Sequence, residues 1–584
     1  MKKIVSLVLA FAMLLGSMLV LVGCGAPEDD GAYIEVYLGN NVYDLDPTDY
    51  YVDSNAEQLM TLIYEPLFRI NEKGRLENAL ADKVEINKDD REIVIELRES
   101  YWSDDKRVEA KDFVYAWCRR LLDPNNANPA ATLLFDIENA VEARTASAGC
   151  TISDVGVKAT DIYELTITYR EGADTDRLLR NLASLATAPV REDIVGADGS
   201  LASNVWSKTV NRVTNGPFKI FYTNPATGEF TLMRNKGYHQ NPAVENYDDE
   251  VIPGRLISFL TTSGDEILVS YADIANKVTF FMSDATLADR ASNKGSAIVR
   301  DLPSTYSYVF NTKNPLFAIK EVRQALSVSI NRDAIISAIT FGKAADGFIP
   351  DSFGGASDAI INTAGDLGLA QQLLSGVDFT GISKAFTLTI DNNEEAIAIA
   401  ELVAATWEEL GFAVTIEVAE LKSFVDQSGG DEVEYLDNGI QYAVKEAAYG
   451  NADYGVIAVD WQMYTDDPFV ALAALKSGFG YGVDFESNTN RTNIASWNNL
   501  DFDSYISAAY KEQNATERAR LLTEAEKLVV DEAAIVPLVF GQSFVFVSKE
   551  LSDVEFDGLG HYVLTSTSQK NYRDYYPEDE KEEE

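Results

Sequence analysis

The sequence predicts an α/β fold, and residues 386–418 carry most of that prediction. Residues 386–390 alternate apolar and polar side chains, as a half-buried strand does. Residues 394–410 then place apolar side chains at helical spacing, and residues 413–418 alternate again. A strand, a helix and a second strand in this order form the unit from which parallel sheets are built. At least one domain of the chain is therefore expected to be α/β.

The turns of this unit have the residues that helix ends require. Asn392 or Asn393 can accept a hydrogen bond from the first free N–H groups of the helix. Gly411 stands just after the helix, where a left-handed backbone is favoured. The helical spacing predicts a buried face that consists of Ile399, Leu402, Val403, Thr406 and Leu410.

Other segments follow the same rules. Residues 93–97 and 165–169 are predicted to be strands, because β-branched and apolar residues dominate them. Residues 109–122 are predicted to form a helix that ends at Asp123-Pro124. A second long helix, 517–531, precedes an apolar run at 534–540.

Composition restricts the function. The chain has 584 residues, which suggests about two to four domains. Its 93 acidic and 48 basic side chains give a net charge of −45, so we expect no nucleic-acid partner. His239 and His561 are the only histidines, and neither has a nucleophile or an acid at the spacing of a known motif. We therefore expect no enzyme, no cofactor and no metal site.

Residues 1–23 have the form of a secretory signal peptide. Two lysines follow Met1, residues 4–22 are almost wholly apolar, and the first acidic residue is Glu28. An uncleaved membrane helix is the alternative, because the apolar run is nearly long enough to cross a bilayer. The charged start and the small residues at the end of the run favour export.

Leu21-Val22-Gly23-Cys24 resembles the lipobox of bacterial lipoproteins. The resemblance implies that Cys24 becomes a lipid-carrying N-terminus, which anchors the protein to the outer face of the cell membrane, or in the periplasm if the cell has an outer membrane. Residues 24–32 would be the tether, and residues 571–584 an acidic, solvated tail. Cys118 and Cys150 could form a disulfide outside the cytoplasm, or each could be a buried free thiol.

A series of short segments resembles one known family when the segments are taken in order. The family is that of the large solute-binding proteins of ABC importers for oligopeptides, dipeptides and related solutes. Each segment is weak alone, but their common order across roughly residues 33–565 is specific. The main segments are 41–47 (NVYDLDP), 62–67 (LIYEPL), 110–117 (AKDFVYAW), 214–219 (TNGPFK), 322–326 (VRQAL), 330–332 (INR) and 534–538 (AIVPL).

The resemblance implies a two-lobed periplasmic-binding-protein-like fold of type II, with an extra inserted domain and a ligand cleft between the lobes. Closure of the lobes would bury the ligand by a hinge motion. The implied domains are lobe one at 33–53, 188–303 and 541–570, the inserted domain at 54–187, and lobe two at 304–540.

The resemblance also implies which segments meet the ligand. In peptide-binding members the ligand lies extended and is held partly as an added strand. The matching segments are Asn41-Val42-Tyr43 and Asp460-Trp461-Gln462. Val42 could instead be a core residue, Tyr43 a surface aromatic and Trp461 a core tryptophan. Trp461 is the stronger candidate because it ends an apolar strand, 456–459, and begins a polar run.

Tyr306 and Tyr308 share one face of an alternating strand, so they are further candidates for the ligand site, with core packing as the alternative.

One position departs from the family pattern. Peptide-binding relatives have an aspartate three residues after the tryptophan, and it pairs with the α-ammonium group of the peptide. Tyr464 stands there in this chain. Asp466 and Asp467 lie just beyond and could replace that aspartate, although Asp467-Pro468 could simply cap the next helix.

The resulting hypothesis is an exported, lipid-anchored, monomeric receptor that captures a peptide or similar solute and delivers it to ABC permease subunits. Two alternatives remain open at this point. The first is a receptor or sensor of the same fold for a non-peptide solute. The second, more distant, is a secreted glycoside hydrolase, although the sequence lacks the eight repeated strand–helix units of a barrel glycosidase.

Overall fold

The computed structural model describes residues 33–37, 46–48, 54–124, 126, 128–195, 213–224, 229–239, 255–259, 271–275, 280–283, 286–351, 358–420, 422–426, 433–437, 439–448, 454–477 and 493–570. The predicted signal peptide, Cys24 and its tether, the segment Asn41-Val42-Tyr43 and the acidic tail lie outside these residues. Within them, no helix combines the length and the apolar character that a membrane span needs.

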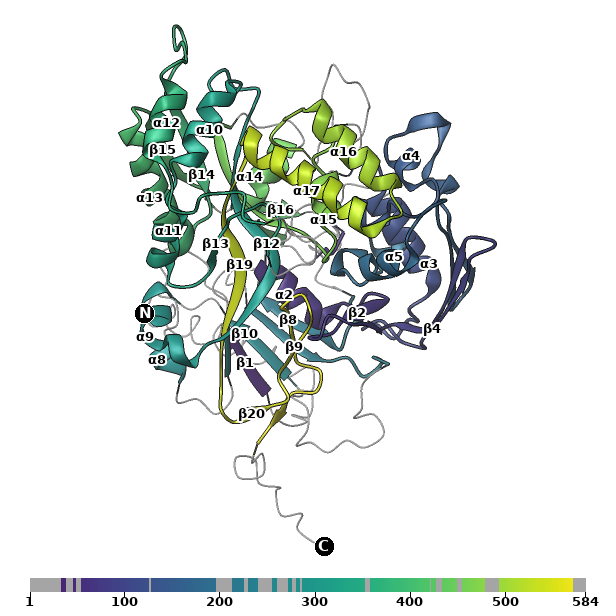
Figure 1. Ribbon diagram of the computed structural model, residues 1–584. Coiled ribbons are helices and arrows are strands. Elements are labelled where there is room, and N and C mark those ends of the chain that lie inside the picture. Colours follow the sequence, from purple (N-terminus) through teal and green to yellow (C-terminus); the bar gives the residue numbers. More distant parts are fainter. Residues whose placement is uncertain are drawn as a thin grey trace, which may run out of the picture.

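A mixed sheet runs through most of the molecule (Figure 1). Its strands lie in the order β15-β14-β18-β12-β19-β11-β1-β10-β9-β8, and β13 pairs with β19. Their bounds are β15 Ala413–Val418, β14 Ala385–Ile390, β18 Val456–Gln462, β12 Ile298–Phe310, β19 Ile535–Val547, β11 Phe280–Ser283, β1 Tyr33–Tyr37, β10 Arg255–Phe259, β9 Glu229–Arg234, β8 Phe218–Asn224 and β13 Lys343–Ala344.

Strands β12 and β19 join the two ends of this sheet. Each has 13 residues, and they pair antiparallel from Ile298–Val545 to Val309–Ile535. Their register shifts between Asp301 and Thr305, around Pro303, which cannot donate a ladder hydrogen bond. The boundaries predicted between the lobes, at 303/304 and 540/541, fall inside these two strands.

Helices cover both faces of the sheet in the second lobe. On one face, α10 (Lys320–Val328), α11 (Arg332–Ile339) and α13 (Glu394–Glu409) pack on β14 and β12. On the other face lie α15 (Pro468–Ala473), α16 (Leu500–Lys511) and α17 (Ala515–Glu532). Apolar side chains of β12 and β18 point alternately to the two faces and contribute to both interfaces, which places a core on each side of the sheet.

The strand–helix–strand prediction is confirmed within one residue. Asn393 accepts a hydrogen bond from the N–H of Ala396 (2.7 Å), and Gly411 has φ +87°. The predicted helix face is wrong at Leu402, which is 39% exposed. Trp407 completes the buried face instead, because its indole fits between the helix and the sheet and donates to the carbonyl of Leu326 (2.9 Å).

The inserted region contains a separate antiparallel sheet. Strands β4 (Ala81–Asn87), β5 (Glu92–Leu97), β7 (Glu164–Thr168) and β6 (Val157–Asp161) lie in this order. The helix predicted at 109–122 begins as α3 (Ala110–Val114) but continues as the π-helix η1 (Tyr115–Leu121). The N–H of Leu122 accordingly bonds to the carbonyl of Trp117. Cys118 and Cys150 are both free thiols, so the disulfide alternative is not formed.

Shorter elements complete the described part of the chain. Those in the first half are α2 Ser54–Ile63, β2 Phe68–Ile70, β3 Leu76–Asn78, η2 Pro129–Leu134, α4 Ala140–Arg144, η3 Ser147–Gly149, η4 Ile152–Asp154, α5 Thr175–Asn181, η5 Leu185–Thr187, α6 Glu192–Val195, α8 Tyr271–Ile274, α9 Leu287–Asn293 and η6 Lys294–Ser296. Those in the second half are α12 Leu367–Leu374, β16 Lys422–Asp426, β17 Val433–Asp437, α14 Gly439–Ala448, β20 Leu551–Ser552, β21 Glu555–Phe556, β22 Tyr562–Val563 and β23 Ser568–Gln569.

Candidate ligand-binding site

Trp461 lies near the end of β18, opposite Thr305 of β12. Its side chain is 1% exposed and meets the ring of Phe348 edge-to-face, with 5.7 Å between ring centroids. The N–H groups of Phe348 and Ile349 both donate to the buried carboxylate of Glu526 at 2.9 Å. Trp461 is therefore fixed by the aromatic ring of a loop that α17 holds in place.

Asp460 and Gln462 flank Trp461 and point to the opposite face of the sheet. The side-chain amide of Gln462 donates to the carboxylate of Asp460 (3.1 Å). Asp460 lies opposite Tyr306 in the neighbouring strand β12. These predicted site residues thus come together, but on the face away from Trp461.

Tyr306 and Tyr308 lie beside each other, with ring centroids 6.0 Å apart. Tyr308 is fully buried and also meets Trp407 edge-to-face at 6.0 Å, so it belongs to the core of lobe two. Tyr306, by contrast, is only partly buried. Burial raises the phenol pKa of both residues, with the nearby ring of Tyr308 and the carboxylate of Asp391 adding to the shift of Tyr306.

Tyr464 stands in the turn after β18 with a left-handed backbone, φ +63°. This conformation is uncommon for a residue other than glycine, asparagine or aspartate. The side chain is 9% exposed, and burial, with a smaller contribution from the carboxylate of Glu57, raises the pKa of its hydroxyl. A neutral phenol therefore occupies the position at which the family resemblance predicts a carboxylate.

The next two carboxylates are already matched by arginines. Asp466 accepts hydrogen bonds from Nε (3.3 Å) and Nη2 of Arg180, which lies on α5 of the inserted region. Asp467 accepts from Nη1 (3.0 Å) and Nη2 (2.8 Å) of Arg518 on α17, and its Oδ1 caps α15 through the N–H of Phe469 (3.1 Å). The expected cap at Asp467-Pro468 is confirmed.

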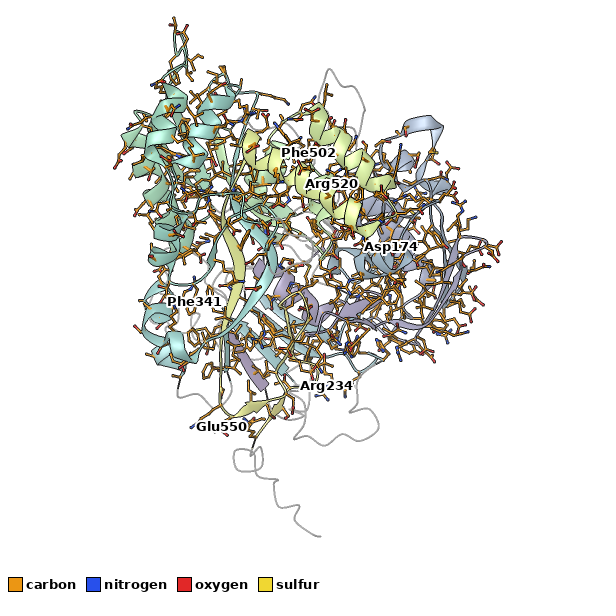
Figure 2. The ribbon with its side chains drawn as sticks, viewed as in Figure 1. Asp174, Arg234, Phe341, Phe502, Arg520 and Glu550 are labelled. Atoms are coloured by element: carbon orange, nitrogen blue, oxygen red, sulfur yellow. The ribbon has the colours of Figure 1, made fainter. Side chains whose placement is uncertain are left out.

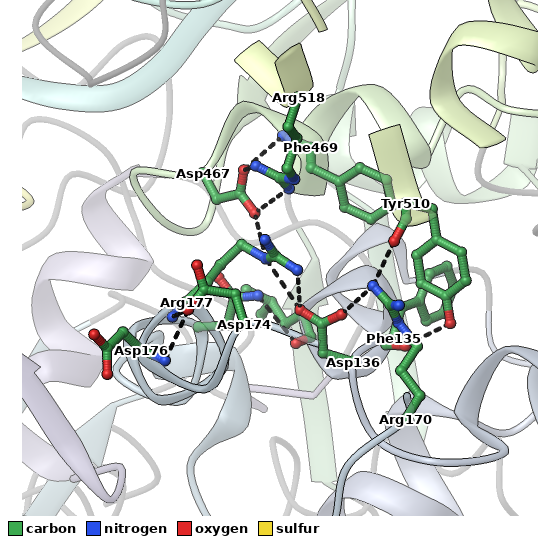
Figure 3. Close-up of polar contacts among 12 residues, drawn as sticks. Phe135, Asp136, Arg170, Asp174, Asp176, Arg177, Asp467, Phe469, Tyr510 and Arg518 are labelled. Carbon is green, nitrogen blue, oxygen red and sulfur yellow. Dashed lines mark hydrogen bonds and ion pairs between the residues drawn. The ribbon is translucent and has the colours of Figure 1, made fainter. Parts of the chain in front are cut away.

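Further arginines extend this arrangement into the inserted region (Figure 3). Arg177 reaches Asp467 at 3.6 Å and Asp136 at 2.6 Å. Arg170 also pairs with Asp136 at 2.6 Å. Sequence reasoning did not identify these residues. Their signal was the spacing of Arg177 and Arg180 on one helix, which puts both side chains on one face.

His561 is a buried histidine that lies near two carboxylates, one of them Glu57. Nε2 of His561 is 3.5 Å from Glu57, and its Nδ1 is 3.1 Å from Asp557. Burial alone would lower the pKa of His561, but the two carboxylates outweigh burial and raise that pKa well above its ordinary value. The described residues contain no group of three or more His, Cys, Asp or Glu side chains arranged to hold a metal ion.

The two lobes, the pair of strands that joins them and the inserted sheet define a type II periplasmic-binding-protein fold. Residues 75–482 match the family model of the bacterial extracellular solute-binding proteins, family 5 (Middle). The chain belongs to this family of solute-binding proteins.

Individual relatives are distant but cover most of the chain. The oligopeptide-binding protein OppA of Bacillus subtilis is 25% identical over 523 residues, which are 87% of each chain. The murein tripeptide-binding protein MppA of Escherichia coli superposes with a TM-score of 0.74 at 22% identity, over 92% of this chain and 98% of MppA.

Two further solved structures are similar to this chain over most of its length. The Haemophilus influenzae OppA complex with the peptide RPPGFSPFR gives a TM-score of 0.73 at 20% identity, over 93% of this chain and 99% of that chain. The unliganded open form of MppA gives only 0.54, over 92% and 97%.

Proposed function

We propose that this chain is the extracytoplasmic receptor of an ABC importer, which captures a peptide or a similar solute by lobe closure and delivers it to the permease. The observation that carries the proposal is the match over most of both chains to a family whose relatives include named oligopeptide-binding proteins. The receptor acts as a monomer and without turnover of its ligand. Its ligand binds between the lobes, near Trp461 and the turn after β18.

The receptor is held at the membrane by lipid on Cys24, after removal of residues 1–23. The support is the charged start, the apolar run and the lipobox-like Leu21-Val22-Gly23-Cys24. In cells fed labelled palmitate, the wild-type chain carries the label and Cys24→Ala does not. A labelled Cys24→Ala variant would refute the anchor.

The bound ligand lacks a free α-ammonium group at the Tyr464 position. Three observations support this part of the proposal. Tyr464 is a neutral phenol, Asp466 is paired with Arg180, and Asp467 is paired with Arg518. A ligand ammonium would therefore meet no uncompensated carboxylate among these residues. The same observations favour a second candidate, a receptor or sensor of this fold for a non-peptide solute.

Calorimetric titration with a random tetrapeptide library and with its N-acetylated counterpart tests this assignment. The wild-type chain should bind both libraries within about threefold of each other. Tyr464→Asp should then prefer the free amine by about tenfold or more, because a charge-assisted hydrogen bond contributes about 1.5–3 kcal/mol. Aspartate also tolerates the left-handed backbone at this position. Tyr464→Asn is the matched control for Tyr464→Asp, since asparagine has nearly the same shape as aspartate but no charge.

The outcomes separate the candidates. If the wild type binds free amines more than tenfold more tightly than N-acetylated peptides, the proposal that the ligand lacks a free α-ammonium group is refuted. Binding of neither library, together with a non-peptide solute found by mass spectrometry in the purified protein, would replace the peptide receptor by the second candidate. Recovery of cleaved peptide after incubation would contradict a receptor without turnover.

A further inference from the structure

The inserted region and the second lobe meet through buried charges. We use the term inter-domain ion cluster for the seven side chains of Asp136, Arg170, Arg177, Arg180, Asp466, Asp467 and Arg518. Arg180 joins Asp466 across the boundary, and Arg177 joins Asp467 across it at 3.6 Å. Most members are strongly buried, with Asp467 only 7% exposed, so bulk solvent screens these pairs weakly.

Aromatic rings connect the same two parts. The guanidinium of Arg170, from the inserted region, lies 3.9 Å from the ring centroid of Tyr510 on α16. The ring of Tyr510 stacks on that of Phe469 in α15, with 6.0 Å between the ring centroids. The guanidinium of Arg518 lies 5.3 Å from the ring centroid of Phe469. The hydroxyl of Tyr510 donates to the carbonyl of Phe135 (2.9 Å). Each ring of the stacked pair thus has a guanidinium over it, a contact that cation–π attraction stabilises.

A second contact lies on the far side of the joining strands. Figure 1 shows α9 and α13 on the left, away from α5 on the right. Arg290 of α9 pairs with Glu395 of α13 at 2.7 Å, and the N–H of Leu287 donates to Glu394 at 3.1 Å. The lobes are therefore held together on both sides of β12 and β19.

The net charge of the chain opposes any compact arrangement. With a charge of −45, like charges along the chain repel one another. All of the contacts described above join residues of the chain itself. They consequently favour the described arrangement of the lobes independently of the ligand.

We propose that the inter-domain ion cluster is a latch that holds the inserted domain on the second lobe and sets the equilibrium between open and closed forms. The latch goes beyond the proposed function, because it requires no particular ligand. Weakening it should open the molecule as a whole. The contact between Leu287 and Glu394, which lies far from the latch, should then break as well.

Hydrogen exchange measured by mass spectrometry on the full chain in detergent micelles tests the latch. In Arg177→Gln/Arg180→Gln, peptides that cover 466–473 should exchange about tenfold faster, since charge-assisted hydrogen bonds are lost. Peptides that cover Leu287 should accelerate by a similar factor. Arg520→Gln is the matched control, because Arg520, which Figure 2 labels on α17, pairs with Glu517 of its own helix and both side chains are exposed. It should change neither segment.

Faster exchange at 466–473 alone would mean a static domain contact and would overturn the latch, as would unchanged exchange in both segments. Asp466→Asn is a milder second variant with almost the same shape, so the test does not depend on the folding of the double variant. The charge-swapped pair Arg180→Asp/Asp466→Arg should restore slow exchange at Leu287. Failure to restore it would also refute the latch. Because no ligand is added, these results are independent of the peptide assignment.

Discussion

Replacing Trp461 by alanine tests whether the candidate site is also part of the core. The side chain is 1% exposed and packs edge-to-face on Phe348. Truncating a buried tryptophan to alanine usually costs about 3–5 kcal/mol of unfolding free energy. The aromatic pair accounts for about 0.5–1.5 kcal/mol of this loss. We therefore expect Trp461→Ala to destabilise the protein by about 3–5 kcal/mol, in addition to any effect on ligand affinity.

Urea unfolding followed by circular dichroism measures this loss. Leu500→Ala is the control, because Leu500 is 71% exposed and its truncation should change the unfolding free energy by about 0.5 kcal/mol or less. Trp461→Phe, which keeps a ring against Phe348, should recover most of the loss. A loss below about 1 kcal/mol in Trp461→Ala, with ligand affinity reduced more than tenfold, would refute the reasoning. Trp461 would then be a wall of the ligand site rather than a core residue.

Three other predictions concern titratable groups. The flanking carboxylates raise the pKa of His561. The contribution of His561 to stability is therefore complete below the ordinary histidine pKa of about 6.5 and is lost as pH rises through the raised pKa. The difference in melting temperature between the wild type and His561→Gln should shrink at alkaline pH. Burial raises the pKa of Asp112 from 3.8 to about 6, so the folded state favours the protonated carboxyl group. The melting temperature of the wild type, measured relative to that of Asp112→Asn, should therefore fall as pH rises from 3.8 to about 6 and then level off. Burial also raises the pKa of the Cys118 thiol to about 12. A thiol reagent should therefore label Cys150 in the native protein and Cys118 only after unfolding, which peptide mapping measures. Equal labelling of both cysteines in the native protein would contradict the burial of Cys118.

The fold was predictable where local chemistry decides it. The unit β14-α13-β15 lies within one residue of its predicted bounds, because Asn393 and Gly411 mark the helix ends independently of the rest of the chain. The helix at 109–122 was predicted less well. Periodicity over so few turns does not separate an α-helix from a π-helix, and the burial of Trp117, which donates to the carbonyl of Thr187, depends on a residue 70 positions away.

The candidate site was predictable only in part, for a related reason. The strand end at Trp461 and the cap at Asp467 follow from local patterns. The partners of the two aspartates do not, because Arg180 is 286 positions from Asp466 and Arg518 is 51 positions from Asp467. A local pattern can place an arginine on a helix face, but the charge that meets it is decided by how the domains pack.

Arg180 links the charge of the candidate site to the position of the lobes. In the structure its guanidinium pairs with Asp466, so that this carboxylate has a cationic partner. Separation of the inserted domain from the second lobe would release the same carboxylate. A cationic ligand group would then compete with Arg180 for Asp466 and weaken the latch, whereas a neutral group would leave the latch intact. If the latch controls closure, closure selects against ligands that place a cationic group beside Asp466. That selectivity comes from Arg180 on α5 rather than from the turn that carries Asp466.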